Sequence, residues 1–80
     1  MKKRPLVLVE WEDISGTSTW SSEEEIQKDA KPIFCQTVGW RLPSKNKRVI
    51  NIVATRTEQG DASDRTTLPR GCVRSIRRLE

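Results

Sequence analysis

The side chains that carry most protein catalysis are scarce in this sequence of 80 residues, which has no histidine and no tyrosine. Histidine is the usual proton shuttle near neutral pH, so a serine or cysteine nucleophile here would need a lysine or a carboxylate as its base. The two cysteines, Cys35 and Cys72, lie far apart beside apolar neighbours and form no Cys-x-x-Cys pair. We interpret them as small buried hydrophobic residues, with a disulfide as the alternative.

Carboxylates are the remaining groups that could support acid–base chemistry or hold a metal ion. The run Glu23–Glu25 falls at an expected helix start, where consecutive side chains point in different directions. Glu10 and Glu12 share one face of an expected strand, where they are typical solvated residues. We therefore expect no catalytic site, no metal, no cofactor and no small-molecule substrate, and we interpret the chain as a non-enzyme.

The hydrophobic pattern predicts mainly β structure, with one short helix between the first and second of five strands. In the first strand Val7, Val9 and Trp11 form the expected inward face. The helix follows Ser21 or Ser22, either of which fits a capping box. The expected strands are Leu6–Asp13, Ile33–Leu42, Arg48–Arg56, Arg65–Leu68 and Cys72–Leu79.

Three local features refine these strands. Gly39 predicts a bulge or a sharp bend in the second strand, which has apolar residues on both faces. Pro69–Gly71 predicts one turn of 3₁₀ helix. In the last strand the apolar residues Val73, Ile76 and Leu79 recur every three positions, so we expect a kink or irregular alternation.

Length and composition predict one domain over residues 1–80, with a folded surface of about 4,900 Å². An open sheet of five strands would leave apolar edges unpaired, which favours closure. The expected fold is therefore a small five-stranded antiparallel sheet, strongly bent or closed into a barrel.

The segment Leu68–Val73, with its proline-led turn before the last strand, resembles the corresponding element of SH3-like barrels, and the order of strands is more loosely similar to Sm-like barrels. The absence of tyrosine sets the chain apart from the peptide groove of SH3 domains. Asn51 alone matches the uridine pattern of Sm proteins, so uridine binding is not implied.

Four segments together resemble small uncharacterised proteins of tailed phages and prophages. This resemblance implies a phage or prophage origin and a compact barrel of one domain, and it implies no activity and no site. The segments are Val9–Asp13, Trp20 with Glu23–Glu25, Val38–Trp40 and Leu68–Val73.

The three tryptophans are the first signal for binding. Trp11 and Trp40 share their strand faces with apolar residues, which predicts core packing. Trp20 stands in a polar loop, where it either caps the open end of the barrel or anchors a partner. Trp20 and Trp40 are the candidate partner-binding residues.

Charge is the second signal. Residues 10–30 hold seven acidic and one basic side chain, whereas residues 31–56 hold six basic and no acidic ones. This segregation fits a solvated surface, a complementary neighbouring subunit, or a basic face that binds phosphates. The candidate nucleic-acid-binding residues are Arg41, Lys45, Lys47, Arg48, Arg74 and Arg77.

Four apolar residues, Leu6–Val9, follow the basic start, too few for the core of a secretion signal. No apolar stretch approaches the ~20 residues that span a bilayer. We therefore expect a cytoplasmic protein without membrane contact, in the host cytoplasm if a phage encodes it. The leading hypothesis is a small interaction module that binds a protein partner or forms a homo-oligomer; the alternative is a nucleic-acid-binding barrel.

Overall fold

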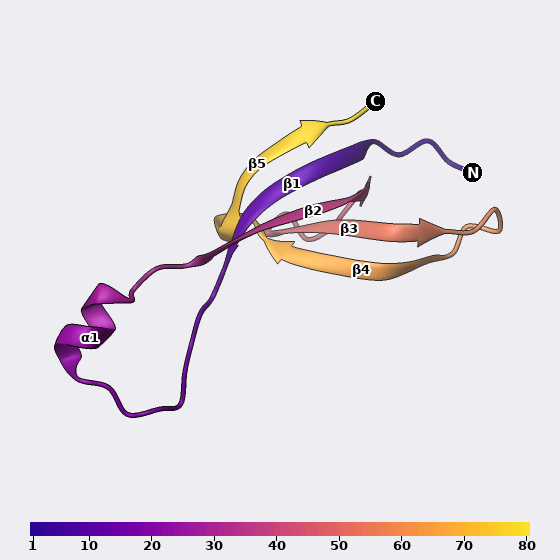
Figure 1. Cartoon of the computed structure of the whole chain (residues 1–80). Coiled ribbons are helices and arrows are strands. Elements are labelled where there is room, and N and C mark those ends of the chain that lie inside the picture. Colours follow the sequence, from indigo (N-terminus) through magenta and orange to yellow (C-terminus); the bar gives the residue numbers. More distant parts are fainter.

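Five strands, one α-helix and one 3₁₀ turn make up the chain in the computed structural model, which describes all 80 residues (Figure 1). Their bounds are β1 Leu6–Asp13, α1 Glu23–Lys28, β2 Ile33–Leu42, β3 Val49–Arg56, β4 Ala62–Pro69, η1 Arg70–Cys72 and β5 Val73–Arg78. The mainly β class and the short helix between the first two strands are confirmed, and β1 and β2 have the predicted bounds. The fourth strand is longer than predicted, since it begins at Ala62 instead of Arg65.

All five strands lie in one antiparallel sheet in the order β4-β3-β2-β1-β5. The sheet is not closed, so the expected closure into a barrel was wrong. Its two edge strands carry charged residues, among them Arg65 on β4 and Arg77 on β5. Charged edge strands discourage edge-to-edge pairing, which lets an open sheet persist without closure.

The core lies on one face of this sheet. Its buried members come from β1, β3 and β4, and Trp11, Val73 and Ile76 pack against them. Val7, Val9 and Trp11 confirm the predicted inward face of the first strand, whereas Leu79, which follows the end of β5, is 42% exposed and does not join the core. The buried cluster consists of Val7, Val9, Ile50, Ile52 and Leu68.

Gly39 makes a close approach between strands, not the predicted bulge: β1 and β2 pair without a register shift around it. A Cβ atom at this position would lie 2.5 Å from the carbonyl oxygen of Val53 and 2.7 Å from a methyl carbon of Ile52. Only glycine fits there. β2 pairs with β3 only over Trp40–Leu42, after Gly39. The earlier part of β2, Ile33–Val38, pairs with β1 on one side and has no strand partner on the other.

The predicted irregularity of the last strand is confirmed. Glu10 on β1 lies opposite Ser75, but its neighbour Trp11 lies opposite Val73, so the register shifts by one residue. The bulge leaves Arg74 unpaired in the ladder, which lets both Val73 and Ile76 face the core.

Residues 14–32, which we call the arm, project away from the sheet (Figure 1). Ser22 caps α1 by accepting a hydrogen bond from the Glu25 amide at 3.2 Å, and no residue of the helix is buried. The arm makes the molecule 53 Å long and 22 Å wide, with a Cα radius of gyration of 16.3 Å. A compact domain of this length would have a radius of about 12 Å.

Candidate functional site

The arm ends in apolar side chains that contact no core. Trp20 is fully exposed (101%), so it does not cap the sheet, and the anchor is the alternative that remains. Ile14 and Ile26, on the same arm, are 87% and 57% exposed. We call Trp20 with Glu23–Glu25 the arm tip. It combines an indole ring with three carboxylates, within six residues of one another.

The second surface is the face of β5, β1 and β2 that points away from the core, which we call the outer face. The strand register places three side chains in a row across it: Arg77, Leu8 and Val38. Val38 is 52% exposed, and Phe34, two rows further along β2, is 66% exposed. The face also includes Glu10, Glu12, Gln36, Trp40, Arg74 and Ser75.

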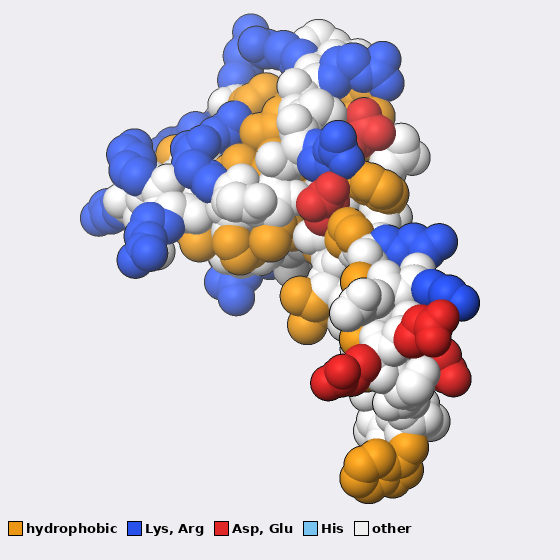
Figure 2. Space-filling view, turned by 90° about the vertical axis from the view of Figure 1, so that its left-hand side faces the viewer, with side chains coloured by type: hydrophobic (Ala, Val, Ile, Leu, Met, Phe, Trp, Pro, Cys, Tyr) orange, Lys and Arg blue, Asp and Glu red, His pale blue; other side chains and the backbone are white.

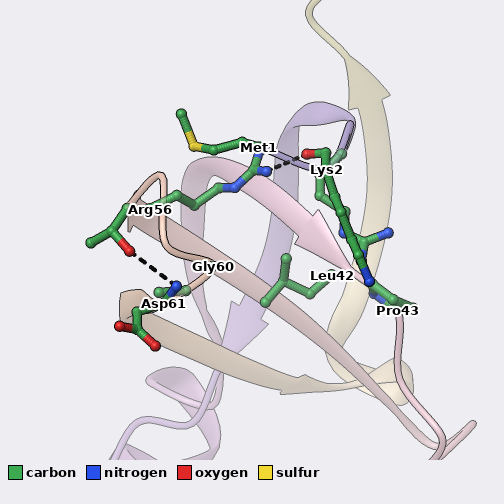
Figure 3. Close-up of a pocket in the computed structure, with 10 residues that line it drawn as sticks. Met1, Lys2, Leu42, Pro43, Arg56, Gly60 and Asp61 are labelled. Atoms are coloured by element: carbon green, nitrogen blue, oxygen red, sulfur yellow. Dashed lines mark hydrogen bonds between the residues drawn. The ribbon is translucent and has the colours of Figure 1, made fainter.

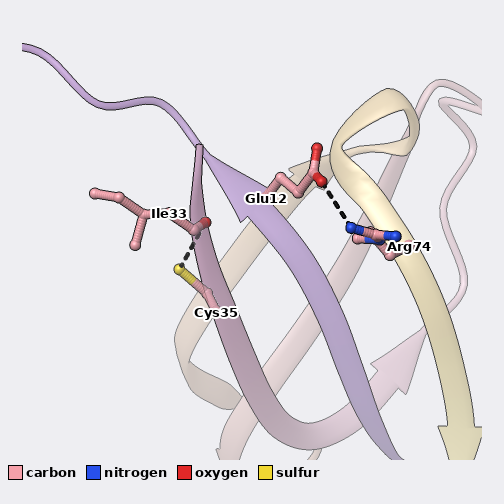
Figure 4. A network of polar contacts seen from close by, with 4 residues as sticks. All are labelled: Glu12, Ile33, Cys35 and Arg74. Carbon is pink, nitrogen blue, oxygen red and sulfur yellow. Dashed lines mark hydrogen bonds and ion pairs between the residues drawn. The ribbon is translucent and has the colours of Figure 1, made fainter. Parts of the chain in front are cut away.

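Polar contacts organise the part of the outer face nearest the arm. Arg74 forms an ion pair with Glu12 at 3.0 Å (Figure 4). The Arg74 guanidinium also lies over the Phe34 ring, 5.0 Å from its centre. Ser75 donates a hydrogen bond to Glu10 at 3.2 Å. Glu10, Phe34, Arg74 and Ser75 line a shallow groove of ≈ 680 Å³ together with Cys35 and Gln36. Since Glu12 neutralises Arg74, Arg77 is the cation on this face that has no acidic partner.

Trp40 is half-buried at the end of the outer face, on the side away from the core, so the predicted core packing of Trp40 is wrong. Val53, its cross-strand neighbour, is buried beside it, although alternation along β3 places Val53 opposite to the core. Arg56 lies 5.4 Å from the centre of the Trp40 ring. The Arg56 guanidinium also donates a hydrogen bond to the Lys2 carbonyl, which closes a hollow of ≈ 420 Å³ beside the N-terminus (Figure 3).

The six candidate nucleic-acid-binding residues fall into two groups. Arg41 and Lys47 line a hollow of ≈ 170 Å³ with Arg70, which donates a hydrogen bond to the Lys47 carbonyl at 2.6 Å. Lys45 and Arg48 lie in the same β2–β3 turn, whereas Arg74 and Arg77 lie on β5. Sequence reasoning missed Arg70, because only the folded chain brings η1 against this turn.

Charge is divided between the arm and the sheet. The arm holds four acidic and two basic side chains, a net charge of −2, and since the whole chain carries +4, the other residues carry +6. Figure 2 shows acidic side chains on the projecting arm, with hydrophobic atoms at its far end, while lysine and arginine side chains cover much of the sheet. The two surfaces are therefore complementary in charge.

The two cysteines and the carboxylates are the remaining groups that the sequence analysis considered. Cys35 and Cys72 are free and only half-buried, so the expected burial is partial. The Cys35 thiol donates a weak hydrogen bond to the Ile33 carbonyl (Figure 4). No group of three or more Cys, Asp or Glu side chains is arranged to hold a metal ion.

Phe34 and Val38 are surface residues that sequence reasoning did not single out. The signal was present, since both share the parity of Trp40 in β2. The core face of this strand holds Cys35, Thr37 and Gly39 instead, and Thr37 accepts a hydrogen bond from the Trp11 indole at 2.9 Å. The prediction that Trp40 packs in the core assigned this parity to the core and so inverted the strand.

No helix of the chain is both long and apolar enough to cross a bilayer. The chain matches no protein-family model, no curated protein and no solved structure.

Proposed function

We propose that this chain is a non-enzymatic interaction module that binds a protein partner or a second copy of itself through the arm tip and the outer face. The observation that carries the proposal is the complete exposure of Trp20 on a projecting arm. Tryptophan is among the residues most enriched in the energetic centres of protein interfaces. Its large apolar surface is costly to leave in water, so a partner that covers it gains binding energy.

Two features of the outer face support the same function. Phe34 and Val38 are more than half exposed on this face. The edge of β2 over Ile33–Val38 also leaves backbone groups free to pair with an added strand. Trp40 contributes the part of its ring that the fold leaves exposed, as a secondary contact.

The resemblance to small proteins of tailed phages and prophages, and to SH3-like barrels, adds two expectations to the proposal. The chain originates from a phage or prophage, and it acts in the host cytoplasm. Recovery of its coding sequence between phage structural or replication genes would test the origin.

Site-specific photo-crosslinking tests the binding surface. A photo-reactive amino acid at position 20 is expected to capture a defined protein, or another copy of the chain, in cells that express it. The same amino acid at Gln59, in the exposed β3–β4 turn far from the arm, is the matched control. Equal capture at the two positions, or no capture at position 20, would contradict the proposal.

Nucleic-acid binding is a second candidate, which the hollow between the β2–β3 turn and η1 favours. Arg41, Lys47 and Arg70 line it without an acidic side chain. A cluster of cations with no acidic partner is the usual electrostatic footprint of a phosphate-binding surface.

Charge reversal tests this candidate. The variant K47E/R48E is expected to weaken oligonucleotide binding about tenfold or more and to reduce the slope of log K against log salt by about two. The measurement is fluorescence anisotropy of a labelled oligonucleotide over a salt series. The variant K2E/K3E makes the same charge change on the N-terminal tail and serves as the control. No binding by the unmodified chain at low salt would eliminate the candidate.

A further inference from the structure

The chain exposes far more surface than its size requires. Its accessible area is 6722 Å², against about 4,900 Å² for a compact monomer of this mass. The excess is about 1,800 Å², whereas a partner in a standard protein interface buries about 800 Å². The excess surface is therefore sufficient for a stable dimer interface.

The same chain supplies both halves of a complementary contact. The arm tip offers one indole ring and three carboxylates, and of these only Glu24 forms an ion pair, with Lys28 at 3.6 Å. The outer face offers Leu8 and Val38 as an apolar strip, with the unpaired cation Arg77 at its border. An apolar group flanked by acids on one surface thus matches an apolar strip flanked by a cation on the other.

We propose that the chain forms a two-fold dimer in which the arm tip of each copy lies on the outer face of the other. Trp20 of one copy covers Leu8 and Val38 of the second, and Glu23 or Glu25 approaches Arg77. This inference rests on the proposed function and names the second copy as its partner.

A reciprocal exchange explains why both surfaces are exposed in one chain. In a two-fold interface each contact occurs twice, so both arms and both outer faces are covered at once. No such surface is left to add a third copy, and the assembly stops at the dimer. The arm carries a net charge of −2 and the rest of the chain +6, and these opposite charges favour an arm lying on the sheet of the second copy over two arms in contact. The dimer therefore weakens as salt screens the charges.

Sedimentation equilibrium of the full chain, between about 1 and 200 µM at low salt, tests the proposal. The expected mass is twice 9.2 kDa at the upper end of the range. W20S is expected to raise the dissociation constant about tenfold or more, because it removes the central apolar contact. Trp20 is fully exposed and packs against no other residue of the chain. W20S is therefore expected to fold as the unmodified chain does.

A charge swap tests the orientation. E23K/E25K and R77E are each expected to weaken the dimer, and the combination E23K/E25K/R77E is expected to recover affinity to within about fivefold of the unmodified chain. The control E58K/D61K makes the same charge change as E23K/E25K in the β3–β4 turn and leaves the dimer intact.

The outcomes separate this inference from the proposed function. A monomer over the whole concentration range overturns the dimer, and so does a dimer that W20S and the charge variants leave unchanged. If the chain is a monomer and position 20 captures a different protein in cells, the proposed function stands and the self-association is wrong. If position 20 captures nothing as well, both fail.

Discussion

Replacing Gly39 by alanine is expected to lower the free energy of unfolding by about 3 kcal/mol or more, most of the stability of a domain this small. The new Cβ atom would lie 2.5 Å from the Val53 carbonyl oxygen. This oxygen belongs to the backbone where β3 pairs with β2, since Val53 lies opposite Trp40. It cannot withdraw without breaking the junction that joins the two halves of the sheet.

Urea unfolding followed by tryptophan fluorescence measures this loss, at a protein concentration low enough that association contributes nothing. Gly16→Ala is the matched control. A Cβ atom at Gly16 has no neighbour within 4 Å, so its effect is expected to stay within about 0.5 kcal/mol. If both variants unfold at the same urea concentration, the close approach at Gly39 is incorrect.

The elements that the sequence predicted best are those with strong local signals. Alternation of apolar residues defined β1 over Leu6–Asp13, and Pro32 marked the limit before β2. The capping-box pattern narrowed the helix cap to Ser21 or Ser22, because its hydrogen bond joins residues three positions apart, and Ser22 is the cap that forms. Each of these signals lies within a few residues of the structure it predicts.

Features that depend on residues far apart in the chain could not be predicted from the sequence. The first part of β4, Ala62–Asp64, has no alternating apolar pattern, and it is a strand because it pairs with the end of β3. Thr55 donates a hydrogen bond to Asp64 across this pair at 3.1 Å. The role of Gly39 likewise arises from a strand more than ten residues away.

The candidate site could be predicted only in part, because it also combines residues that lie far apart in the chain. The polar sequence around Trp20 marked a loop, but only the folded chain shows that Trp20 has no packing partner and does not cap the sheet, while its role as an anchor stays a prediction. The parity of β2 placed Phe34 and Val38 on one face, yet the register with β5 was needed to place Arg77 beside them. A surface assembled from three strands cannot be read from any one of them.

Ile52→Ala is the second variant with a large expected effect, a loss of about 2 to 5 kcal/mol. Ile52 is 1% exposed and is one of the five residues of the buried cluster. Its truncation leaves a cavity in a core that has few other side chains to fill it. Ile14→Ala removes the same atoms from a side chain that is 87% exposed, and it is expected to change stability by less than about 0.5 kcal/mol. Equal losses in the two variants would contradict the assignment of the core face.

A Cβ atom at position 39 would meet both the Ile52 side chain and the Val53 backbone. The double variant tests which of these two contacts excludes residues other than glycine. Removing the Ile52 methyl carbon relieves the contact at 2.7 Å, but the contact with the Val53 carbonyl oxygen at 2.5 Å remains. Since a backbone oxygen held in the sheet cannot yield as a side chain can, G39A/I52A is expected to be no more stable than G39A, by urea unfolding or by the loss of β-sheet circular dichroism. A double variant more stable than G39A would show that the side chain, and not the strand junction, is what requires glycine.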